Sequence, residues 1–453
     1  MNGPPDGRAG LTRRELEVAA LVAEGLTNRQ IAERLFISER TADGHLEHIR
    51  EKLGVRSRSQ ITAWFIEQSR APAAGLTPVE RSGSRRRVAL AAASAVVVLL
   101  SAAIGLIADT PLGRPAQPGG PVISTAVGFG KPGPDGGGHS GDGGPATAAQ
   151  LRRPLAVAPA PNDSLYIADS FNGLVRRVDA RGVITSVVGG QSVPFKEGAL
   201  GTAVGVGSPR AVAASRDVRL YLSTDLGLYR LDRDGSLHSL LAASPAPWPG
   251  SFGGVAIGPG DAIFVADRVQ HVVLRLASDG SIGAYAGTGE AGFSGDGGAA
   301  TGARLEMPTA LAVDSKGNLY IADAGNNRVR RVDFATGSIS TVAGSSDIYG
   351  YGGDGGPASR ARLSLPSGLA IDAADNLYIA DTGNNRVREV SRAGRITTLV
   401  GSGSPGAGGD GGLAIKAQLF APEGLAIDKT GNLYIADTGN NRIRKLLLRN
   451  GGA

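Results

Sequence analysis

One phrase of fourteen residues recurs along the C-terminal two thirds of the chain and constrains the fold more than any other feature. It reads LYIADSFNGLVRRV from Leu165, LYIADAGNNRVRRV from Leu319, LYIADTGNNRVREV from Leu377 and LYIADTGNNRIRKL from Leu433. Two weaker versions are LYLSTDLGLYRL from Leu220 and IFVADRVQHVVLRL from Ile263. The aligned aspartates, 42 to 58 residues apart, are Asp169, Asp225, Asp267, Asp323, Asp381 and Asp437. Such a period indicates one supersecondary unit per repeat.

Each unit predicts four short strands. In the fifth unit they are LPSGLAI, NLYIAD, RVREV and RITTLVG, separated by the polar turns DAAD, TGNN and SRAG. This alternation of apolar or β-branched runs with turns is typical of an antiparallel meander. The second strand is apolar on both faces, so its sheet needs a neighbour on each side. A radial stack of four-stranded sheets provides both neighbours, which predicts a β-propeller of six blades.

The two ends of the repeat region predict a closed ring. The sixth copy stops after its third strand, RIRKLLL, and lacks a fourth. A lone strand of the missing type, VISTAVG, stands at residues 122–128. We expect this strand to complete the last blade, because closure removes the exposed edge of an open array.

The repeats resemble the NHL family in the phrase LYIADTGNNRVR and in loops such as SGDGGPAT at 140–147 and GGDGGPAS at 352–359. The resemblance implies a propeller that binds proteins, carbohydrates or other ligands on one face. Some members bind RNA, and a few related propellers are lyases or hydrolases. The nearly balanced charge of this region disfavours RNA.

The recurring aspartates favour a structural role over a catalytic or metal-binding one, because function tends to lie where blades differ. An aspartate before TGNN can accept turn N–H groups, and Arg386 and Arg388 can pair with nearby carboxylates. The loop aspartates Asp142, Asp296, Asp354 and Asp410 leave weak calcium binding as an alternative. The three histidines of the repeat region, His139, His238 and His271, come from different blades. We therefore expect no enzyme, no cofactor and no metal.

Residues 11–68 predict four short helices. Thr12 and Glu15 form a capping box, Gly25 ends the first helix, and Thr27 and Asn28 can cap the second. The third is expected to place Ala42, His45, Ile49 and Leu53 on its inner face and to end at Gly54. We favour a packed His45 over a functional one. Two helices joined by a tight turn and supported by two more form a helix-turn-helix domain.

The pattern LT-x-RE-x-EV, G-x-TN-x-x-IA-x-x-L-x-IS-x-x-T and KLGV-x-SR resembles the LuxR-type helix-turn-helix domain of bacterial transcription factors. The resemblance implies a third helix in the DNA major groove, a second across the backbone and a fourth that often dimerises.

The third helix departs from that family, which usually has a Val-Lys pair where Ala42 and Asp43 stand, and often a basic residue at the position of Glu47. We assign phosphate contacts to Thr27, Asn28, Arg40, Thr41, Arg50, Lys52 and Arg56. Asp43, Gly44 and Glu47 complete the expected DNA-binding surface, with base readout left open.

Between the two regions, residues 88–108 carry no charge, proline or amide. As a helix they would span about 31 Å, close to the hydrocarbon thickness of a bilayer. Arg85, Arg86 and Arg87 precede them, so the positive-inside tendency places the N-terminal side in the cytoplasm.

These observations predict a multidomain chain: an all-α helix-turn-helix domain, one transmembrane helix and an all-β propeller. The expected segments are a disordered N-terminus (1–10), the DNA-binding domain (11–68), a basic linker (69–87), the span (88–108), a second linker (109–121), the propeller (122–448) and a tail (449–453). The expected location is the cell membrane, single-pass, with an extracytoplasmic propeller.

The function expected is a one-component transcriptional regulator. Its partners would be DNA, the membrane, an extracytoplasmic protein or small ligand, and a second copy in a homodimer. The alternative is a membrane-tethered binding or adhesion scaffold whose helix-turn-helix no longer binds DNA specifically. A tethered enzyme is a third class, which a metal in the purified propeller would support.

Overall fold

The computed structural model divides the chain into two compact units, Met1–Thr110 and Pro111–Ala453, which are described separately. It describes residues 11, 15, 18–19, 21–22, 31, 39–53, 55 and 61 of the first unit, and residues 120–130, 133, 137–241, 251–277, 280–345 and 349–448 of the second. The expected N-terminus (1–10), linker (69–87), span (88–108) and tail (449–453) lie outside these ranges.

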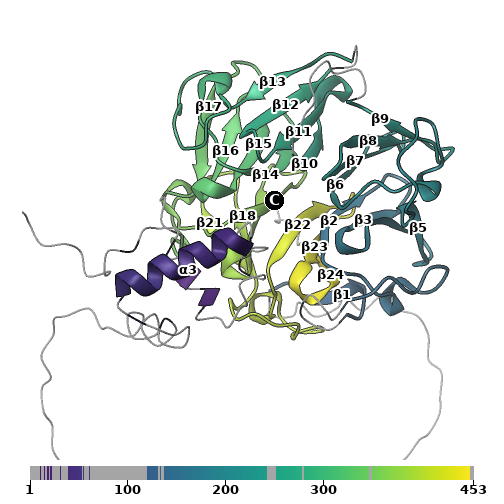
Figure 1. Ribbon diagram of the computed structural model, residues 1–453, viewed down its shortest axis with the longest axis horizontal. Coiled ribbons are helices and arrows are strands. Elements are labelled where there is room, and N and C mark those ends of the chain that lie inside the picture. The colour runs from purple at the N-terminus through teal and green to yellow at the C-terminus, as the bar shows by residue number, and fades with distance from the viewer. Residues whose placement is uncertain are drawn as a thin grey trace, which may run out of the picture. The chain divides into compact units, whose positions relative to one another are not determined.

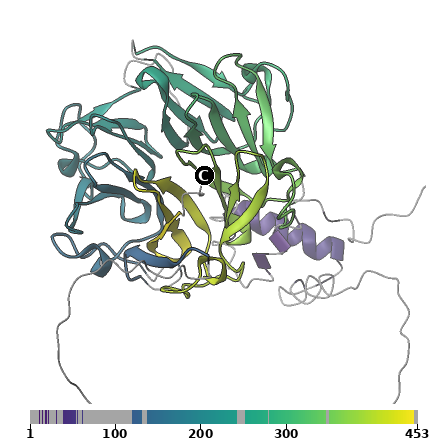
Figure 2. The same ribbon diagram turned by 180° about the vertical axis from the view of Figure 1, so that it is seen from behind.

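The second unit is a six-bladed β-propeller, as predicted (Figures 1 and 2). Each blade is a four-stranded antiparallel meander. Blades 1 to 3 consist of β2 (Pro154–Pro159), β3 (Leu165–Asp169), β4 (Leu174–Val178), β5 (Ile184–Gly189); β6 (Pro209–Ala214), β7 (Leu220–Thr224), β8 (Leu228–Leu231), β9 (Leu237–Ser239); and β10 (Phe252–Ile257), β11 (Ile263–Asp267), β12 (Val272–Leu276), β13 (Ile282–Ala286). Blades 4 to 6 consist of β14 (Pro308–Val313), β15 (Leu319–Asp323), β16 (Arg328–Val332), β17 (Ile339–Ala343); β18 (Pro366–Ile371), β19 (Leu377–Asp381), β20 (Arg386–Val390), β21 (Ile396–Val400); and β22 (Pro422–Ile427), β23 (Asn432–Asp437), β24 (Arg442–Leu447), β1 (Ile123–Val127).

The first strand of each blade is innermost, because these six strands contact one another in sequence around the ring. The second strand is buried on both faces, and all five residues of β19 are buried. Apolar residues of neighbouring blades form shared cores. One such cluster joins Ala322 of blade 4 to Leu369 and Ile379 of blade 5. The blades therefore bury their faces against each other, as the apolar pattern predicts.

Close packing of the innermost strands requires a small residue at the third position of each. A Cβ on Gly254 would lie 2.7 Å from the Cα of Ala310 in the next blade, and one on Gly424 would lie 2.6 Å from the Cα of Ala156. Contacts this short leave no room for a side chain, so glycine at these positions sets the spacing between blades.

The ring closes through β1, which we call the latch strand. It is the outermost strand of blade 6 and pairs antiparallel with β24, placing Ile123 opposite Leu446 and Thr125 opposite Arg444. Ile123 is fully buried. The predicted closure by an N-terminal strand is confirmed.

One local detail differs from the sequence expectation, and one turn shows a conformation that the sequence left open. In blade 2, β7 ends at Thr224, which occupies the position of the repeated aspartate, and Asp225 follows one residue later. In the turn after β19, the left-handed residue is Asn385, with a φ of 52°, whereas Gly383 lies in a short 3₁₀ turn. Asparagine tolerates this conformation well enough that glycine is not needed there.

The first unit is built around α3 (Glu39–Leu53), which ends one residue before Gly54. The N–H of Val55 donates to the carbonyl of Arg50, as in a Schellman C-cap. The core of this unit contains Val18, Ala19, Leu21, Val22, Ile31, Leu46, Ile49 and Ile61.

The expected inner face of this helix is corrected at His45. Leu46 is 1% exposed and Ile49 is fully buried, whereas His45 is only half-buried. Leu46 and Ile49 lie three residues apart on one face, and the apolar leucine is buried in preference to the polar imidazole.

The predicted transmembrane helix is not supported, which corrects both the fold class and the expected single-pass membrane location. Among the residues described, no helix is long and apolar enough to cross a membrane. The only complete α-helix there, α3, has 15 residues and a polar sequence, and it would reach only about 22 Å. Residues 88–108 themselves lie outside the described ranges.

Candidate functional site

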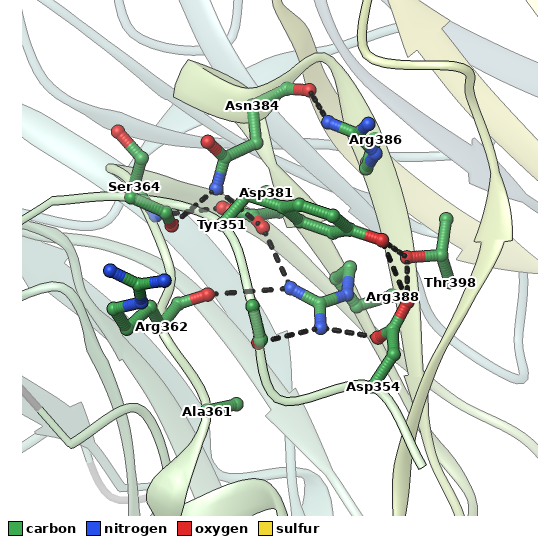
Figure 3. Close-up of polar contacts among 12 residues, drawn as sticks. Tyr351, Asp354, Ala361, Arg362, Ser364, Asp381, Asn384, Arg386, Arg388 and Thr398 are labelled. Atoms are coloured by element: carbon green, nitrogen blue, oxygen red, sulfur yellow. Dashed lines mark hydrogen bonds and ion pairs between the residues drawn. The ribbon is translucent and has the colours of Figure 1, made fainter. Parts of the chain in front are cut away.

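The repeated aspartate of each regular blade lies at the centre of a buried polar network, shown for blade 5 in Figure 3. Asp381 accepts hydrogen bonds from the N–H of Ser364 at 2.7 Å and from Nδ2 of Asn384 at 2.8 Å. Nη1 of Arg388 lies 3.1 Å from its second oxygen, and Nη2 of the same arginine reaches Asp354 in the GDGG loop at 2.5 Å. Asp381 and Arg388 are both fully buried. The network joins two strands and a loop of one blade.

Four blades share this arrangement. Their aspartate, asparagine and arginine sets are Asp169, Asn172 and Arg176; Asp323, Asn326 and Arg330; Asp381, Asn384 and Arg388; and Asp437, Asn440 and Arg444. Burial raises the pKa of each aspartate to about 6, because desolvation outweighs the hydrogen bonds and the arginine charge. The N–H that each aspartate accepts belongs to a residue 17 positions earlier, outside its own turn. These contacts support the structural role inferred from the repeats.

The loop aspartates are held by the same arginines. Asp142, Asp296, Asp354 and Asp410 form ion pairs with Arg176, Arg330, Arg388 and Arg444, respectively. Asp354 also accepts hydrogen bonds from the hydroxyls of Thr398 and Tyr351. In each loop a guanidinium group therefore supplies the positive charge that a calcium ion would otherwise bring, which favours the structural reading of these loops.

The three propeller histidines lie in separate places. His271 follows β11, and its Nδ1 accepts the N–H of Met307 in the next blade at 3.1 Å. His139 is exposed in the loop before β2. On β9, the ring nitrogens of His238 lie 2.7 Å from Glu197 and 3.1 Å from the hydroxyl of Ser236.

Ser236, His238 and Glu197 have the spacing of a serine triad, but their hydrogen bonds do not activate the serine. The Ser236 hydroxyl is 2.6 Å from Asp234, to which it donates its proton. A second carboxylate, Asp232, lies 3.4 Å from Nε2 of His238.

A cleft of about 490 Å³ lies between blades 1 and 2, lined in part by Tyr166, Leu200 and Asp232. Asp232 pairs with Arg230 at 2.9 Å. Nε of Arg233, also on the wall, donates to the carbonyl of Asp217. Asp232 and Arg233 are therefore both engaged by other groups of blade 2.

Blade 3 departs from the regular network. Leu274 occupies the position of the repeated arginine, opposite Val265. One oxygen of Asp267 accepts the N–H groups of Val269 and Gln270, and the other oxygen is buried without a hydrogen-bond partner in the described residues. Burial raises the pKa of Asp267.

The innermost strands differ most at their second residue. The first residue is proline in five blades and the third is Gly or Ala, whereas the second residues are Leu155, Arg210, Gly253, Thr309, Ser367 and Glu423. Next to Gly253 lies the side chain of Arg268, the residue after β11; a Cβ on Gly253 would be 3.2 Å from its Cγ and Cδ. We call Arg210, Arg268 and Glu423 the axial cluster.

The axial cluster brings three charges together from blades 2, 3 and 6. Burial lowers the pKa of Arg268 to about 10, the charge of Arg210 lowers it too, and the charge of Glu423 opposes both. Blades 3 and 6 are opposite members of the ring, so the charge of Glu423 acts on the pKa of Arg268 across the axis of the ring.

The same end of the ring carries exposed apolar side chains. Phe171, Leu226 and Val269, in the turns after the second strands of blades 1, 2 and 3, are 47%, 69% and 53% exposed. The corresponding turns of blades 4 to 6 carry glycine, as at Gly383. This end therefore has a distinct apolar side.

In the helix-turn-helix unit, two of the predicted phosphate-binding cations form ion pairs. Nζ of Lys52 lies 2.7 Å from the carboxylate of Glu15, which is buried, and this pair joins the first helical segment to α3. Arg50 lies 2.7 Å from the exposed Glu47. Lys52 thus neutralises a buried carboxylate, whereas Arg50 and Glu47 share an exposed surface with His48.

The predicted DNA-binding residues are described to different extents. The structure places the backbone of Arg40, Thr41, Asp43 and Gly44 in α3, together with Glu47, Arg50 and Lys52. Thr27, Asn28 and Arg56 lie outside the described residues. Their roles in DNA binding stay predictions. Sequence reasoning missed the axial cluster, although an alignment of the six innermost strands would have shown their variable second residue.

Comparison with known proteins agrees with the two-unit organisation. Residues 9–65 match the family of bacterial regulatory proteins of the luxR type. Residues 207–351 and 349–407 match the teneurin NHL domain, and residues 421–446 match the NHL repeat. The chain therefore carries a LuxR-type helix-turn-helix domain and an NHL-repeat propeller.

Curated relatives match the repeat-rich part of the chain at modest identity. Protein SUPPRESSOR OF QUENCHING 1, chloroplastic, of Arabidopsis thaliana is 29% identical over 214 residues, covering 46% of this chain and 20% of that protein. NHL repeat-containing protein 2 of Bos taurus is 27% identical over 303 residues, covering 63% and 38%. Teneurin-1 of Gallus gallus is 27% identical over 275 residues, covering 56% and 8%. The chain thus spans well under half the length of each of these relatives.

Solved structures resemble the propeller in fold. A Bacteroides thetaiotaomicron protein of unknown function has a TM-score of 0.55 and 18% identity, covering 72% of this chain and 76% of its own. An auxiliary nutrient binding protein from the same organism has a TM-score of 0.54 and 17% identity, covering 72% and 75%. At these identities the likeness shows the fold alone.

Proposed function

We propose that this protein is a one-component transcriptional regulator, in which the helix-turn-helix unit binds DNA and the propeller binds a ligand or protein partner that changes DNA binding. The observation that carries the proposal is the packing of α3. Leu46 and Ile49 anchor it to the core, and the pair of Lys52 with the buried Glu15 fixes its C-terminal end. His48, Glu47 and the partly exposed Arg50 are left on its outer surface.

A packed α3 with one polar face outward matches the way that a recognition helix is presented to the major groove. The luxR-type match over residues 9–65 supports the same reading. For the propeller, the end with the axial cluster and the exposed Phe171, Leu226 and Val269 is the face that we assign to the ligand or partner. Exposed apolar groups gathered on one face favour an interaction surface. The proposal includes no enzymatic activity.

Regulation requires two states of the protein that differ in affinity for the ligand and for DNA. A ligand that binds the propeller equally well in both states would leave DNA binding unchanged. The coupling is therefore a measurable quantity: DNA affinity with and without the ligand.

The second candidate is a binding scaffold whose helix-turn-helix no longer recognises DNA specifically. Asp43 in the sequence and the pairing of Arg50 with Glu47 favour it, because both reduce the positive charge that the unit offers to phosphate. The two candidates differ in whether the full chain selects a discrete DNA sequence.

The deciding experiment is selection of genomic fragments by the purified full chain, followed by footprinting on the enriched fragment. A regulator gives a discrete protected site that is lost in Arg40→Ala. The control Arg181→Ala removes an exposed propeller arginine, 83% accessible, and keeps the footprint. Enrichment of no sequence, or equal loss in both variants, contradicts DNA recognition and favours the scaffold.

A further inference from the structure

Blade 1 lacks a contact that the other regular blades share. In blades 4, 5 and 6 a tyrosine of the second strand donates its hydroxyl to an aspartate in the turn that precedes that strand. The pairs are Tyr320 with Asp314 at 3.4 Å, Tyr378 with Asp372 at 3.0 Å and Tyr434 with Asp428 at 3.2 Å. In blade 1 the tyrosine is Tyr166, and Ala160 stands where the aspartate would be. The hydroxyl of Tyr166 therefore has no carboxylate in its own turn.

The backbone of this turn is the same with either residue. The N–H of Ala160 donates to the carbonyl of Ser164 at 2.8 Å, and the N–H of Asp314 donates to the carbonyl of Asn318 at 3.1 Å. The alanine thus removes a carboxylate from beside Tyr166 and leaves the fold of the turn unchanged.

The residue opposite Tyr166 is a cation without an acidic partner. Arg177 on β4 is directly opposite Tyr166 on β3 in the antiparallel register, so the two side chains lie on the same face of the blade. At the equivalent place in blade 4, Arg331 pairs with Asp333 at 3.1 Å. The corresponding aspartate of blade 1, Asp179, pairs with a different arginine. Among the described residues, Arg177 forms no ion pair, and its Nε is buried without a hydrogen-bond partner.

Tyr166 and Arg177 both line the cleft of about 490 Å³ between blades 1 and 2. This volume is within the usual range of small-molecule sites, about 300–1,000 Å³. The rest of the wall combines apolar side chains with hydroxyl groups, among them Val187, Leu200, Leu231, Ser186 and Thr202. The cleft can therefore accommodate a molecule that has both an apolar and a polar part.

The charges on the wall favour a negative group beside Arg177. Asp232 is the only acidic residue among the described residues that line the cleft, and it pairs with Arg230 at 2.9 Å. Burial raises the pKa of Tyr166, because desolvation outweighs the effect of the neighbouring Arg177. Its hydroxyl is therefore protonated at neutral pH and can donate. A guanidinium group and a phenol side by side are two donors suited to one oxyanion.

The cleft and the end of the ring that carries Phe171 and Leu226 are at opposite ends of the propeller. Asn162 and Arg233, on the cleft wall, lie in turns that join a first strand to a second and a third strand to a fourth. Phe171 and Leu226 lie in turns that join a second strand to a third. In an antiparallel meander these two kinds of turn are at opposite ends of the sheet.

We propose that this cleft is a further binding site of the propeller, for a small molecule that carries a carboxylate on an apolar body. Arg177 and Tyr166 donate to the carboxylate, and the apolar body packs against Val187 and Leu200. The ligand supplies to Tyr166 the carboxylate that an aspartate of the turn supplies in blades 4 to 6. This site goes beyond the proposed function, because it requires neither DNA binding nor a partner at the other end of the ring.

The test is calorimetric titration of the full chain at low ionic strength with two probes, octanoate and phenylacetate, each compared with its neutral amide. Saturable binding of at least one carboxylate is expected. Its amide should bind at least about tenfold more weakly, because it brings no charge to Arg177. Arg177→Gln should weaken binding of the carboxylate by at least about tenfold, and Tyr166→Phe by a smaller factor, because it removes one neutral donor.

A separate variant, Ala160→Asp, restores the aspartate that blades 4 to 6 carry. The new carboxylate should accept the hydroxyl of Tyr166 and repel the carboxylate of the probe, so binding should be lost. The midpoint of unfolding in urea should equal that of the wild type or exceed it, which separates loss of the site from loss of the fold. The matched control is Arg331→Gln, at the same strand position in blade 4, which should leave the affinity unchanged.

Four results would each overturn the proposal. They are no saturable binding of either carboxylate, equal affinity for a carboxylate and its amide, unchanged affinity in Ala160→Asp, and equal losses of affinity in Arg177→Gln and Arg331→Gln. The DNA footprint is measured separately, so a chain that binds the carboxylate but no DNA refutes the regulator and leaves the site standing.

Discussion

Two neighbouring arginines on β16 provide a direct test of the buried networks. Arg330 is fully buried; its Nη2 lies 2.7 Å from Asp296, and its Nη1 lies 3.4 Å from Asp323. Arg331 points to the other face, is 35% exposed and pairs with Asp333 at 3.1 Å. Arg330→Met keeps most of the apolar stem and removes the guanidinium group, and Arg331→Met makes the same change one residue away.

The expected magnitudes follow from burial. Removing Arg330 leaves the fully buried Asp323 without its cation, and breaking a buried pair in this way costs about 3–5 kcal/mol. The exposed pair of Arg331 contributes about 0–1 kcal/mol. Unfolding by urea, followed by circular dichroism, should therefore show a clearly lower midpoint for Arg330→Met and little change for Arg331→Met.

The pH dependence gives a second readout. Burial raises the pKa of Asp323 to about 6, and loss of the Arg330 charge raises that pKa further. A carboxyl whose pKa is higher in the folded than in the unfolded state stabilises the fold when protonated, and that stability is lost as the pH rises through the folded value. The deficit of Arg330→Met should therefore be larger at pH 8 than at pH 5.

A double variant, Arg330→Met with Asp323→Asn, should recover part of the loss, because the uncompensated charge is gone. The coupling is expected to be about 1–3 kcal/mol. Equal costs for Arg330→Met and Arg331→Met, or a pH-independent deficit, would refute the argument that these networks stabilise the blades.

Three further variants test other features. Asp267→Asn keeps an oxygen that accepts the turn N–H groups and removes a buried negative charge that has no arginine beside it. Because burial raises the pKa of Asp267, the stability of the variant in urea unfolding should equal that of the wild type near pH 4 and exceed it as the pH rises. Lys52→Met should destabilise the helix-turn-helix unit by about 2 kcal/mol or more, measured as loss of helical signal on heating, because the buried carboxylate of Glu15 loses the cation that lies 2.7 Å from it. Ile123→Lys places a charge in the core of blade 6 and should release the latch strand, seen as faster proteolysis before residue 128 and as concentration-dependent oligomers in light scattering.

Much of the propeller could be predicted because its information is local and repeated. Short runs of residues were enough to predict the strands, the turns and the lone strand at 122–128. The number of repeats predicted the number of blades. The helix-turn-helix was readable from its apolar spacing, whereas the expected caps at Thr12, Thr27 and Asn28 lie outside the described residues. The exception was His45. A shift of one residue in the helical pattern decides which side chain faces the core, and the structure buries Leu46 there instead.

The features that were missed depend on contacts between distant residues. Asp381 was expected to accept hydrogen bonds from its own turn, but it accepts one from Ser364, on the approach to another strand. The axial cluster forms only because the ring brings blade 6 opposite blade 3. The predicted span at 88–108 was wrong for a different reason: it relied on the length of an apolar stretch and on the arginines before it, and no helix in the described residues supports it.

The latch strand also sets the order in which the protein can be completed during synthesis. Ile123 is made early, but its partner Leu446 follows 323 residues later (446 − 123). At about 5–20 residues per second, the ribosome needs roughly 15–65 s to produce that partner. For that interval the first strand of the propeller has no native neighbour, and five blades can assemble while the sixth waits. The latch strand is thus the first strand of the propeller to be synthesised and the last to pair, which makes it the propeller segment that a chaperone would have most reason to hold.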